Sequence, residues 1–208
     1  MADDRTVPAA GNLAKSRSWC GVTWDNGGSA GRGNGEHASV SRGIDHIGVT
    51  VPDLDAATRF FVEAFDAAVL YDTLRRDDGP VGGPDTERRL GVPAGTAEVA
   101  IRMLALPNGP GIELFEFRTP RRRDPAVPSD LGWQHVAFYV DDLDAAAARV
   151  SRAGGIPLGD PRPLPGPESG PRNRFWYART PWGGTLELLT YPDPQPYEET
   201  TDLRRHRP

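Results

Sequence analysis

The chain has 208 residues, with 24 Lys and Arg against 29 Asp and Glu, and a formal net charge of −5 at pH 7. This length can bury a core without disulfides, and the single cysteine, Cys20, excludes an internal disulfide framework. The acidic balance argues against a nucleic-acid-binding protein, and no apolar run approaches the roughly 18–20 residues of a membrane span.

The first 41 residues are rich in glycine, with six glycines between Gly21 and Gly35 and no apolar periodicity. Such a segment cannot bury enough apolar surface to offset its chain entropy. It also lacks the apolar stretch of a secretory signal. We therefore expect residues 1–41 to be a flexible leader, followed by one domain over residues 42–198 and a tail over residues 199–208.

The residue pattern changes at Ile44, where branched apolar residues begin to alternate with polar or small ones. Alternating, branched residues over Ile44–Val51 predict a half-buried strand, which Pro52 ends. Asp53 then suits the N-cap of an amphipathic helix. The apolar face of that helix is expected to hold Leu54, Ala57, Phe60, Phe61, Ala64 and Phe65.

The same unit occurs again 89 positions later. The segment HIGVTVPDLDAA, from His46, matches HVAFYVDDLDAA, from His135, at seven of twelve positions. The second helix is expected to begin after Asp142 and to end at Gly154–Gly155. An internal repeat of strand, cap and helix in one register indicates two copies of one structural unit.

Each unit closes with an alternating strand that carries a carboxylate: Glu113 within Gly111–Phe117, and Glu187 within Gly184–Tyr191. Further strands are expected between these anchors, over Glu98–Ala105 and Asn173–Thr180. The predicted fold class is α+β, with two βαβββ modules forming a half-barrel. The modules are expected over residues 42–120 and 131–193, with Pro-rich loops over Gly79–Pro93, Thr119–Pro128 and Pro157–Pro171.

A histidine in the first strand and a glutamate in the last strand, found twice, are the chemically informative residues. Pleating places His46 on the sheet face opposite the aliphatic residues that should pack against the helix, and the same holds for His135. Taken singly, such a His or Glu is usually an ordinary strand residue. At equivalent positions of a repeat, His46, Glu113, His135 and Glu187 together predict an N2O2 site for a divalent cation, namely Zn, Mn, Co, Ni or Fe.

These residues also carry a family resemblance. The segments IDHIGVTVPDLDAATRFF, GIELFEF, QHVAFYVDDLDAAAARV and FWYARTPWGGTLELLTYP resemble the vicinal oxygen chelate superfamily, across residues 42–198. This superfamily includes glyoxalase I, methylmalonyl-CoA epimerase, extradiol dioxygenases and antibiotic resistance proteins. The resemblance implies that the metal ligands are His46, Glu113, His135 and Glu187.

The retention of all four ligands resembles the epimerase and glyoxalase branch. It implies an enzyme that removes a proton next to a carbonyl, through a metal-stabilised enediolate, and then returns it. Glu187 or Glu113 would serve as the base, and Glu98 is a candidate by resemblance to the non-ligand base of methylmalonyl-CoA epimerase. The chain layout further resembles enzymes of C7-cyclitol biosynthesis, a group that includes epi-valiolone epimerase, and so implies a cyclic polyhydroxy ketone as substrate. Candidate stacking faces for such a ring are Tyr139, Trp176, Tyr177 and Trp182.

Several alternatives remain open at this stage. A methylmalonyl-CoA-type epimerase or a glyoxalase I-like lyase keeps the same ligands, and a thioester substrate would favour basic loops such as Arg121–Arg123 or Arg172 and Arg174. An iron-dependent extradiol dioxygenase and a non-catalytic antibiotic-binding protein are the other two. For each, we expect a cytoplasmic homodimer that takes a small molecule, with neither nucleic acid nor membrane as partner.

Overall fold

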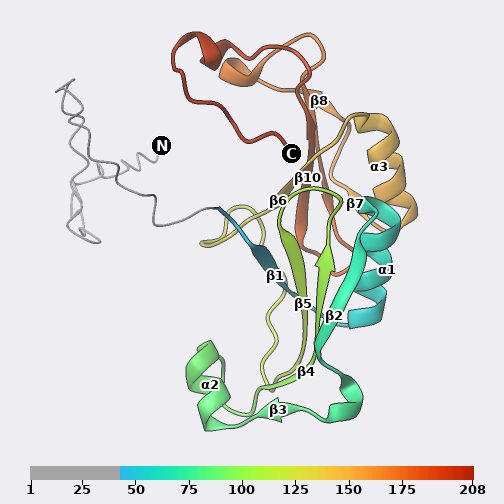
Figure 1. The fold of residues 1–208 in the computed structure, drawn as a ribbon, viewed down its shortest axis with the longest axis vertical. Coiled ribbons are helices and arrows are strands. Elements are labelled where there is room, and N and C mark those ends of the chain that lie inside the picture. Colours follow the sequence, from blue (N-terminus) through green and yellow to red (C-terminus); the bar gives the residue numbers. More distant parts are fainter. Residues whose placement is uncertain (1–42) are drawn as a thin grey trace, which may run out of the picture. The chain divides into compact units, whose positions relative to one another are not determined.

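The computed structural model describes residues 43–208, which contain two sheets flanked by helices (Figure 1). The predicted leader lies outside the described residues. The first sheet and its helices consist of β1 (His46–Val51), α1 (Leu54–Phe65), β2 (Ala68–Leu74), the 3-10 turn η1 (Arg76–Asp78), β3 (Val81–Gly82), α2 (Pro84–Leu90), β4 (Ala97–Ala105) and β5 (Gly111–Arg118). The second group consists of β6 (Val136–Tyr139), α3 (Leu143–Arg152), β7 (Ile156–Pro157), β8 (Arg162–Pro163), η2 (Gly166–Glu168), β9 (Arg174–Arg179), β10 (Thr185–Thr190) and η3 (Pro196–Glu199).

The two sheets have the same topology. The strand order is β1-β5-β4-β2 in the first and β6-β10-β9-β7 in the second, and the short strands β3 and β8 pair with β4 and β9. In each sheet the first strand runs parallel to the last strand, and the last strand runs antiparallel to the one before it. The predicted pair of βαβββ modules is therefore confirmed.

Both long helices begin at the predicted aspartates. The Asp53 carboxylate accepts a hydrogen bond from Ala56 N at 2.8 Å, and the Asp142 carboxylate accepts one from Ala145 N at 3.0 Å. Each bond satisfies a backbone N–H that the first helical turn leaves without a partner. The repeated D-L-D-A-A sequence thus sets the same helix start in both modules.

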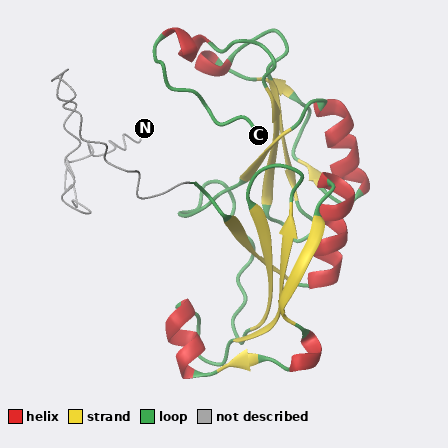
Figure 2. Cartoon of the chain, in the orientation of Figure 1, coloured by secondary structure: helices red, strands yellow, loops and turns green. Residues whose placement is uncertain are grey.

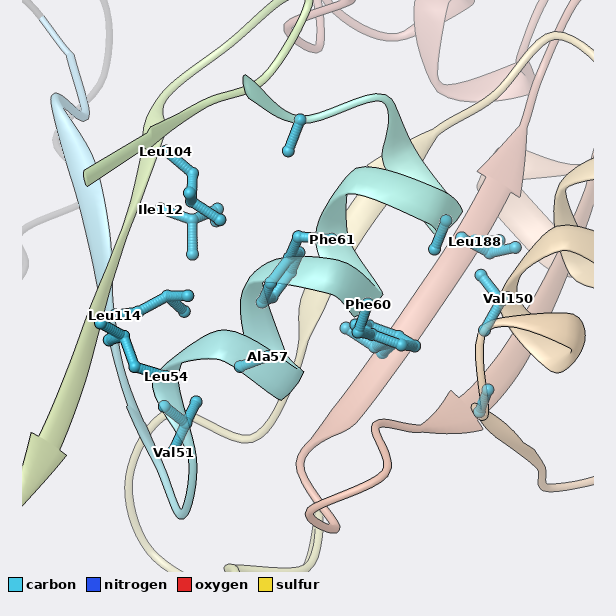
Figure 3. Packing of buried hydrophobic residues seen from close by; sticks show 14 of the residues in the cluster. Val51, Leu54, Ala57, Phe60, Phe61, Leu104, Ile112, Leu114, Val150 and Leu188 are labelled. Atoms are coloured by element: carbon cyan, nitrogen blue, oxygen red, sulfur yellow. The ribbon is translucent and has the colours of Figure 1, made fainter. Parts of the chain in front are cut away.

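Helices α1 and α3 lie on the same side of the two sheets (Figure 2). The main core lies between these helices and the sheets and joins the two modules, with Phe60, Phe61 and Leu114 in the first and Val150 and Leu188 in the second (Figure 3). No helix among residues 43–208 is long and apolar enough to cross a membrane. Because the helices cover one face of each sheet, the predicted site residues must come from the other face, called the open face below.

The Pro-rich segment Gly79–Pro93 contains more structure than a loop. Strand β3 and helix α2 lie within it, and α2 has Pro84 in its first turn and ends at Gly91, whose φ is +65°. A helix of seven residues shows too few turns for an apolar period, so only its proline start and glycine stop could have indicated it.

Candidate metal and catalytic site

The first predicted ligand pair lies together on the open face of the first sheet. His46 Nε2 is 3.3 Å from Glu113 Oε2. Across the parallel pair of β1 and β5, Glu113 faces Gly48, two positions after His46. The two side chains therefore meet on a diagonal, within the reach of neighbouring positions on one sheet face.

The second pair repeats this arrangement. His135 Nε2 is 3.1 Å from Glu187 Oε2, and Glu187 faces Ala137, again two positions after the histidine. The carboxylates are largely shielded, with exposed fractions of 17% for the Glu113 side chain and 13% for that of Glu187. The repeat thus builds the same His–Glu pair twice.

The second ring nitrogen of each histidine donates to a neighbouring side chain. His46 Nδ1 donates to the Asp45 carboxylate at 2.8 Å, and His135 Nδ1 donates to the Gln134 side-chain oxygen at 3.0 Å. The hydrogen bond to Asp45, with a smaller contribution from the charge of Glu113, raises the pKa of His46. A bond at Nδ1 leaves Nε2 as the lone-pair nitrogen of the neutral ring, which is the usual state of a metal-ligating histidine.

The two pairs suit a divalent cation. Two ligand atoms that are each about 2.1 Å from one ion lie about 3.0–3.4 Å apart at octahedral or tetrahedral angles. The N···O separations of 3.3 Å and 3.1 Å fall in this range, although they also suit an ordinary hydrogen bond. Within residues 43–208, no group of three or more His, Cys, Asp or Glu side chains could surround one ion. The structure brings the ligand candidates together as two pairs, and the joint four-ligand site stays a prediction.

Tyr177 lies beside both residues of the His135–Glu187 pair. It faces Glu187 directly across β9 and β10, and its ring lies edge-on to that of His135, with centroids 5.6 Å apart. Burial raises the pKa of Tyr177, and the nearby charge of Glu187 raises it further. The first sheet has Met103 at the equivalent position, opposite Glu113. The sequence offered Tyr177 only as a stacking face; its place beside the carboxylate follows from the register of the β9–β10 hairpin.

Glu98 lies farther along the open face of the first sheet. It faces Phe117 across β4 and β5, and Phe117 is four positions beyond Glu113, or about 13 Å along the strand. Glu98 is buried, with 5% of its surface exposed, and Arg89 of α2 lies 3.4 Å from its carboxylate. Glu98 is therefore held in an ion pair away from the His46–Glu113 pair.

The predicted stacking aromatics are largely occupied by contacts within the protein. Trp176 is buried, and its Nε1 donates to Gly159 O at 2.7 Å. Trp182 packs edge-on against Phe60, with centroids 5.4 Å apart. Both tryptophans serve mainly the core of the protein.

The last residues of the chain cover Tyr139 and Tyr191, which lie beyond Glu187 on the open face of the second sheet. The Tyr191 hydroxyl donates to His206 O at 3.0 Å. The Arg207 guanidinium lies 4.8 Å from the centre of the Tyr191 ring and 5.6 Å from that of Tyr139. Arg205 adds a second cation over Tyr191, at 5.0 Å. The chain end therefore closes this part of the open face.

A cavity of about 940 Å³ lies between β1 and the second module. It is lined by β1, by residues 122–126, by residues 133–136 and by the turn that precedes β10. Of the four ligand candidates, only His135 contributes to this lining. The cavity thus reaches the predicted site at His135.

The basic residues proposed for a thioester substrate have different surroundings. Arg172 pairs with Asp193 at 2.6 Å, and Arg174 pairs with Asp144 at 2.9 Å. Arg122 and Arg123 line the cavity, and Arg122 donates to Phe117 O at 2.7 Å. Because Arg172 and Arg174 are each paired with an aspartate, their positive charge is largely neutralised, and they do not form a basic groove for a thioester substrate.

The family model of the glyoxalase/bleomycin resistance protein/dioxygenase superfamily matches residues 43–188. The chain belongs to this superfamily. It is 40% identical, over 168 residues, to a 2-epi-5-epi-valiolone epimerase from Actinomyces sp., covering 79% of this chain and 88% of that protein. The chain is an enzyme of the superfamily, and this relative supports the epimerase class.

Solved structures of the superfamily share the fold. A glyoxalase family protein from Bacillus cereus has a TM-score of 0.57 at 24% identity, over 75% of this chain and 98% of that one. A glyoxalase/bleomycin resistance protein/dioxygenase domain from Frankia sp. EAN1pec has a TM-score of 0.50 at 23% identity, over 74% of this chain and 99% of that one. At these identities the likeness concerns the fold alone.

Proposed function

We propose that this enzyme is a metal-dependent epimerase. Its substrate would be a cyclic polyhydroxy ketone of the 2-epi-5-epi-valiolone type, inverted at a carbon next to the ketone. The relative at 40% identity supports the substrate class. The observation that carries the chemistry is the His–Glu pair that both modules build in the same register.

The residues that would hold the cation are His46, Glu113, His135 and Glu187. A bound divalent cation supplies Lewis-acid stabilisation of the negative charge that develops on the ketone oxygen. Asp45 and Gln134 orient the two rings through their Nδ1 atoms, so that each Nε2 points to its glutamate.

The two glutamates are proposed to carry out the proton transfers. Glu187 is proposed to take the α-proton, because its carboxylate is well shielded and Tyr177 faces it. Glu113, from the other module, is proposed to serve the opposite face of the substrate carbon. The Tyr177 hydroxyl is protonated at neutral pH, as is usual for tyrosine, and burial raises its pKa further, so it can donate a hydrogen bond to Glu187 or to substrate oxygen.

The test combines two measurements on the full chain. Metal content is measured by mass spectrometry, and deuterium incorporation is followed by NMR when the enzyme acts on 2-epi-5-epi-valiolone in D2O. We expect one divalent cation per site and deuterium at the inverted carbon. Chelation should abolish exchange, and adding the cation back should restore it. An enzyme that inverts the substrate without taking up solvent deuterium, or that works equally well after chelation, would contradict the proposal.

A further inference from the structure

Trp133 is an exposed tryptophan beside the candidate site. It lies in the segment just before β6 and is 98% exposed, whereas Trp176 is buried and Trp182 is packed against Phe60. Covering a large exposed indole with an apolar surface lowers the free energy, because apolar area is removed from water. Trp182 also lines the cavity, but its ring packs on Phe60, so Trp133 has the least covered indole among the tryptophans of residues 43–208.

The position of Trp133 places it at the opening of the 940 Å³ cavity. Trp133 and His135 both line this cavity, and a side chain that is 98% exposed can line it only at its mouth. Leu131, two residues earlier, is also fully exposed but does not line the cavity. The two apolar residues of this segment thus differ in their relation to the site.

Gln134 holds this segment in place. Its side-chain oxygen accepts from His135 Nδ1 at 3.0 Å, and its side-chain nitrogen donates to Pro128 O at 3.3 Å. One amide therefore links the orientation of the histidine ring to the loop that precedes Trp133. The backbone of Trp133 is anchored relative to the His135–Glu187 pair.

We infer that Trp133 is a substrate-contacting residue whose indole stacks on the C–H face of the cyclic polyhydroxy ketone. This inference rests on the proposed function. A saturated polyol ring presents an apolar C–H face and a rim of hydroxyls, so a flat aromatic ring can cover the face while the rim reaches polar groups. With its face on Trp133 at the cavity mouth, the ring lies next to His135.

The experiment compares three variants of the full chain with the wild type, using 2-epi-5-epi-valiolone as the probe. We expect Trp133→Ala to raise KM between about threefold and tenfold, with kcat changed less than twofold, because a stacking contact contributes to substrate binding. Trp133→Phe should restore most of the affinity. Leu131→Ala, in the same exposed segment, should leave both constants unchanged.

Fluorescence gives a readout that does not depend on turnover. Titration of the wild type with the probe should shift the tryptophan emission to shorter wavelength, and Trp133→Phe should remove most of that shift, with any remainder coming from Trp182, which also lines the cavity. The inference would be overturned if Trp133→Ala had the KM of the wild type, or if Trp133→Ala and Leu131→Ala had equal effects. In either case, solvent exchange by the wild type would still support the proposed function. Absence of exchange in the metal-loaded wild type would instead contradict the proposed function.

Discussion

The glutamates of the open face differ in the side chains that surround them. Glu187 lies beside His135 and opposite Tyr177, whereas Glu98 lies opposite Phe117 with Arg89 against its carboxylate. A base must approach the proton that it removes within hydrogen-bonding reach. On this geometry Glu187 suits the task and Glu98 serves the packing of α2 on the sheet.

Two matched substitutions test this difference. Glu187→Gln keeps an oxygen for the cation but removes the base, so we expect exchange to fall by about 10²–10⁴-fold with metal still bound. Glu98→Gln should leave exchange within a few-fold of wild type and should mainly loosen its contact with Arg89. Solvent-exchange rates and metal content measure both. A large loss of exchange in a stable, metal-loaded Glu98→Gln variant would move the catalytic role to Glu98.

At the scale of residues, the sequence repeat predicted that two histidines and two glutamates lie on the sheet faces opposite the helices, because strand alternation and a shared register follow from local pattern. Their arrangement as two His–Glu pairs comes from the structure, and their convergence on one cation stays a prediction. The repeat did not predict that Trp176 and Trp182 serve the core, since this depends on what the helices and loops place against them. No sequence pattern indicates a role for Trp133, for the same reason. Its relation to the cavity arises only when β1 and the second module come together.

The helices begin through the same device in both modules, which makes the N-cap testable. Asp142→Ala removes the acceptor for Ala145 N and should lower the free energy of unfolding by about 1 kcal/mol. Asp142→Asn keeps a capping oxygen and should cost much less. Urea denaturation compares the two. Equal losses would show that the negative charge at Asp142, and not the cap, stabilises α3.

The chain end offers a second element to test. Arg207 lies over the rings of Tyr191 and Tyr139, whereas the side-chain hydrogen bonds of Arg204 within residues 43–208 go to Thr201 O and Leu203 O of its own segment. We expect Arg207→Ala to destabilise the protein by about 1 kcal/mol, and Arg204→Ala to have little effect. Denaturant titrations of both variants provide the measurement, and a larger loss in Arg204→Ala would contradict the packing described for the chain end.

At the scale of the whole molecule, the sequence predicted two modules but not how they join. Their contact depends on pairs far apart in the chain: Phe65 stacks on Phe138 with ring centroids 3.9 Å apart, and Arg149 holds Asp66 through two hydrogen bonds, at 2.6 and 2.7 Å. Arg149 also donates to Glu63 O at the end of α1. None of these partners lies at equivalent positions of the repeat, so the repeat could not reveal them.

The Asp66–Arg149 pair gives the joint between the modules a pH dependence. The hydrogen bond from Arg149 lowers the pKa of Asp66 below its ordinary value of 3.8. The pair therefore contributes its full stability above pH 3.8 and loses it as the pH falls through the lower pKa of the folded state. Asp66 adopts a left-handed backbone conformation, with φ at 55°, which asparagine tolerates, so Asp66→Asn removes the charge with little strain.

We expect Asp66→Asn to lower Tm at pH 7 and the Tm gap from wild type to close as the pH is taken below 3.8. Other ion pairs are present in both proteins and cancel in the comparison. Arg149→Met should cost more than Asp66→Asn and should keep part of its deficit in acid, because it also loses the bonds to Glu63 O. Thermal unfolding at a series of pH values measures both gaps. A gap for Asp66→Asn that persists unchanged in acid would show that the ion pair does not join the modules.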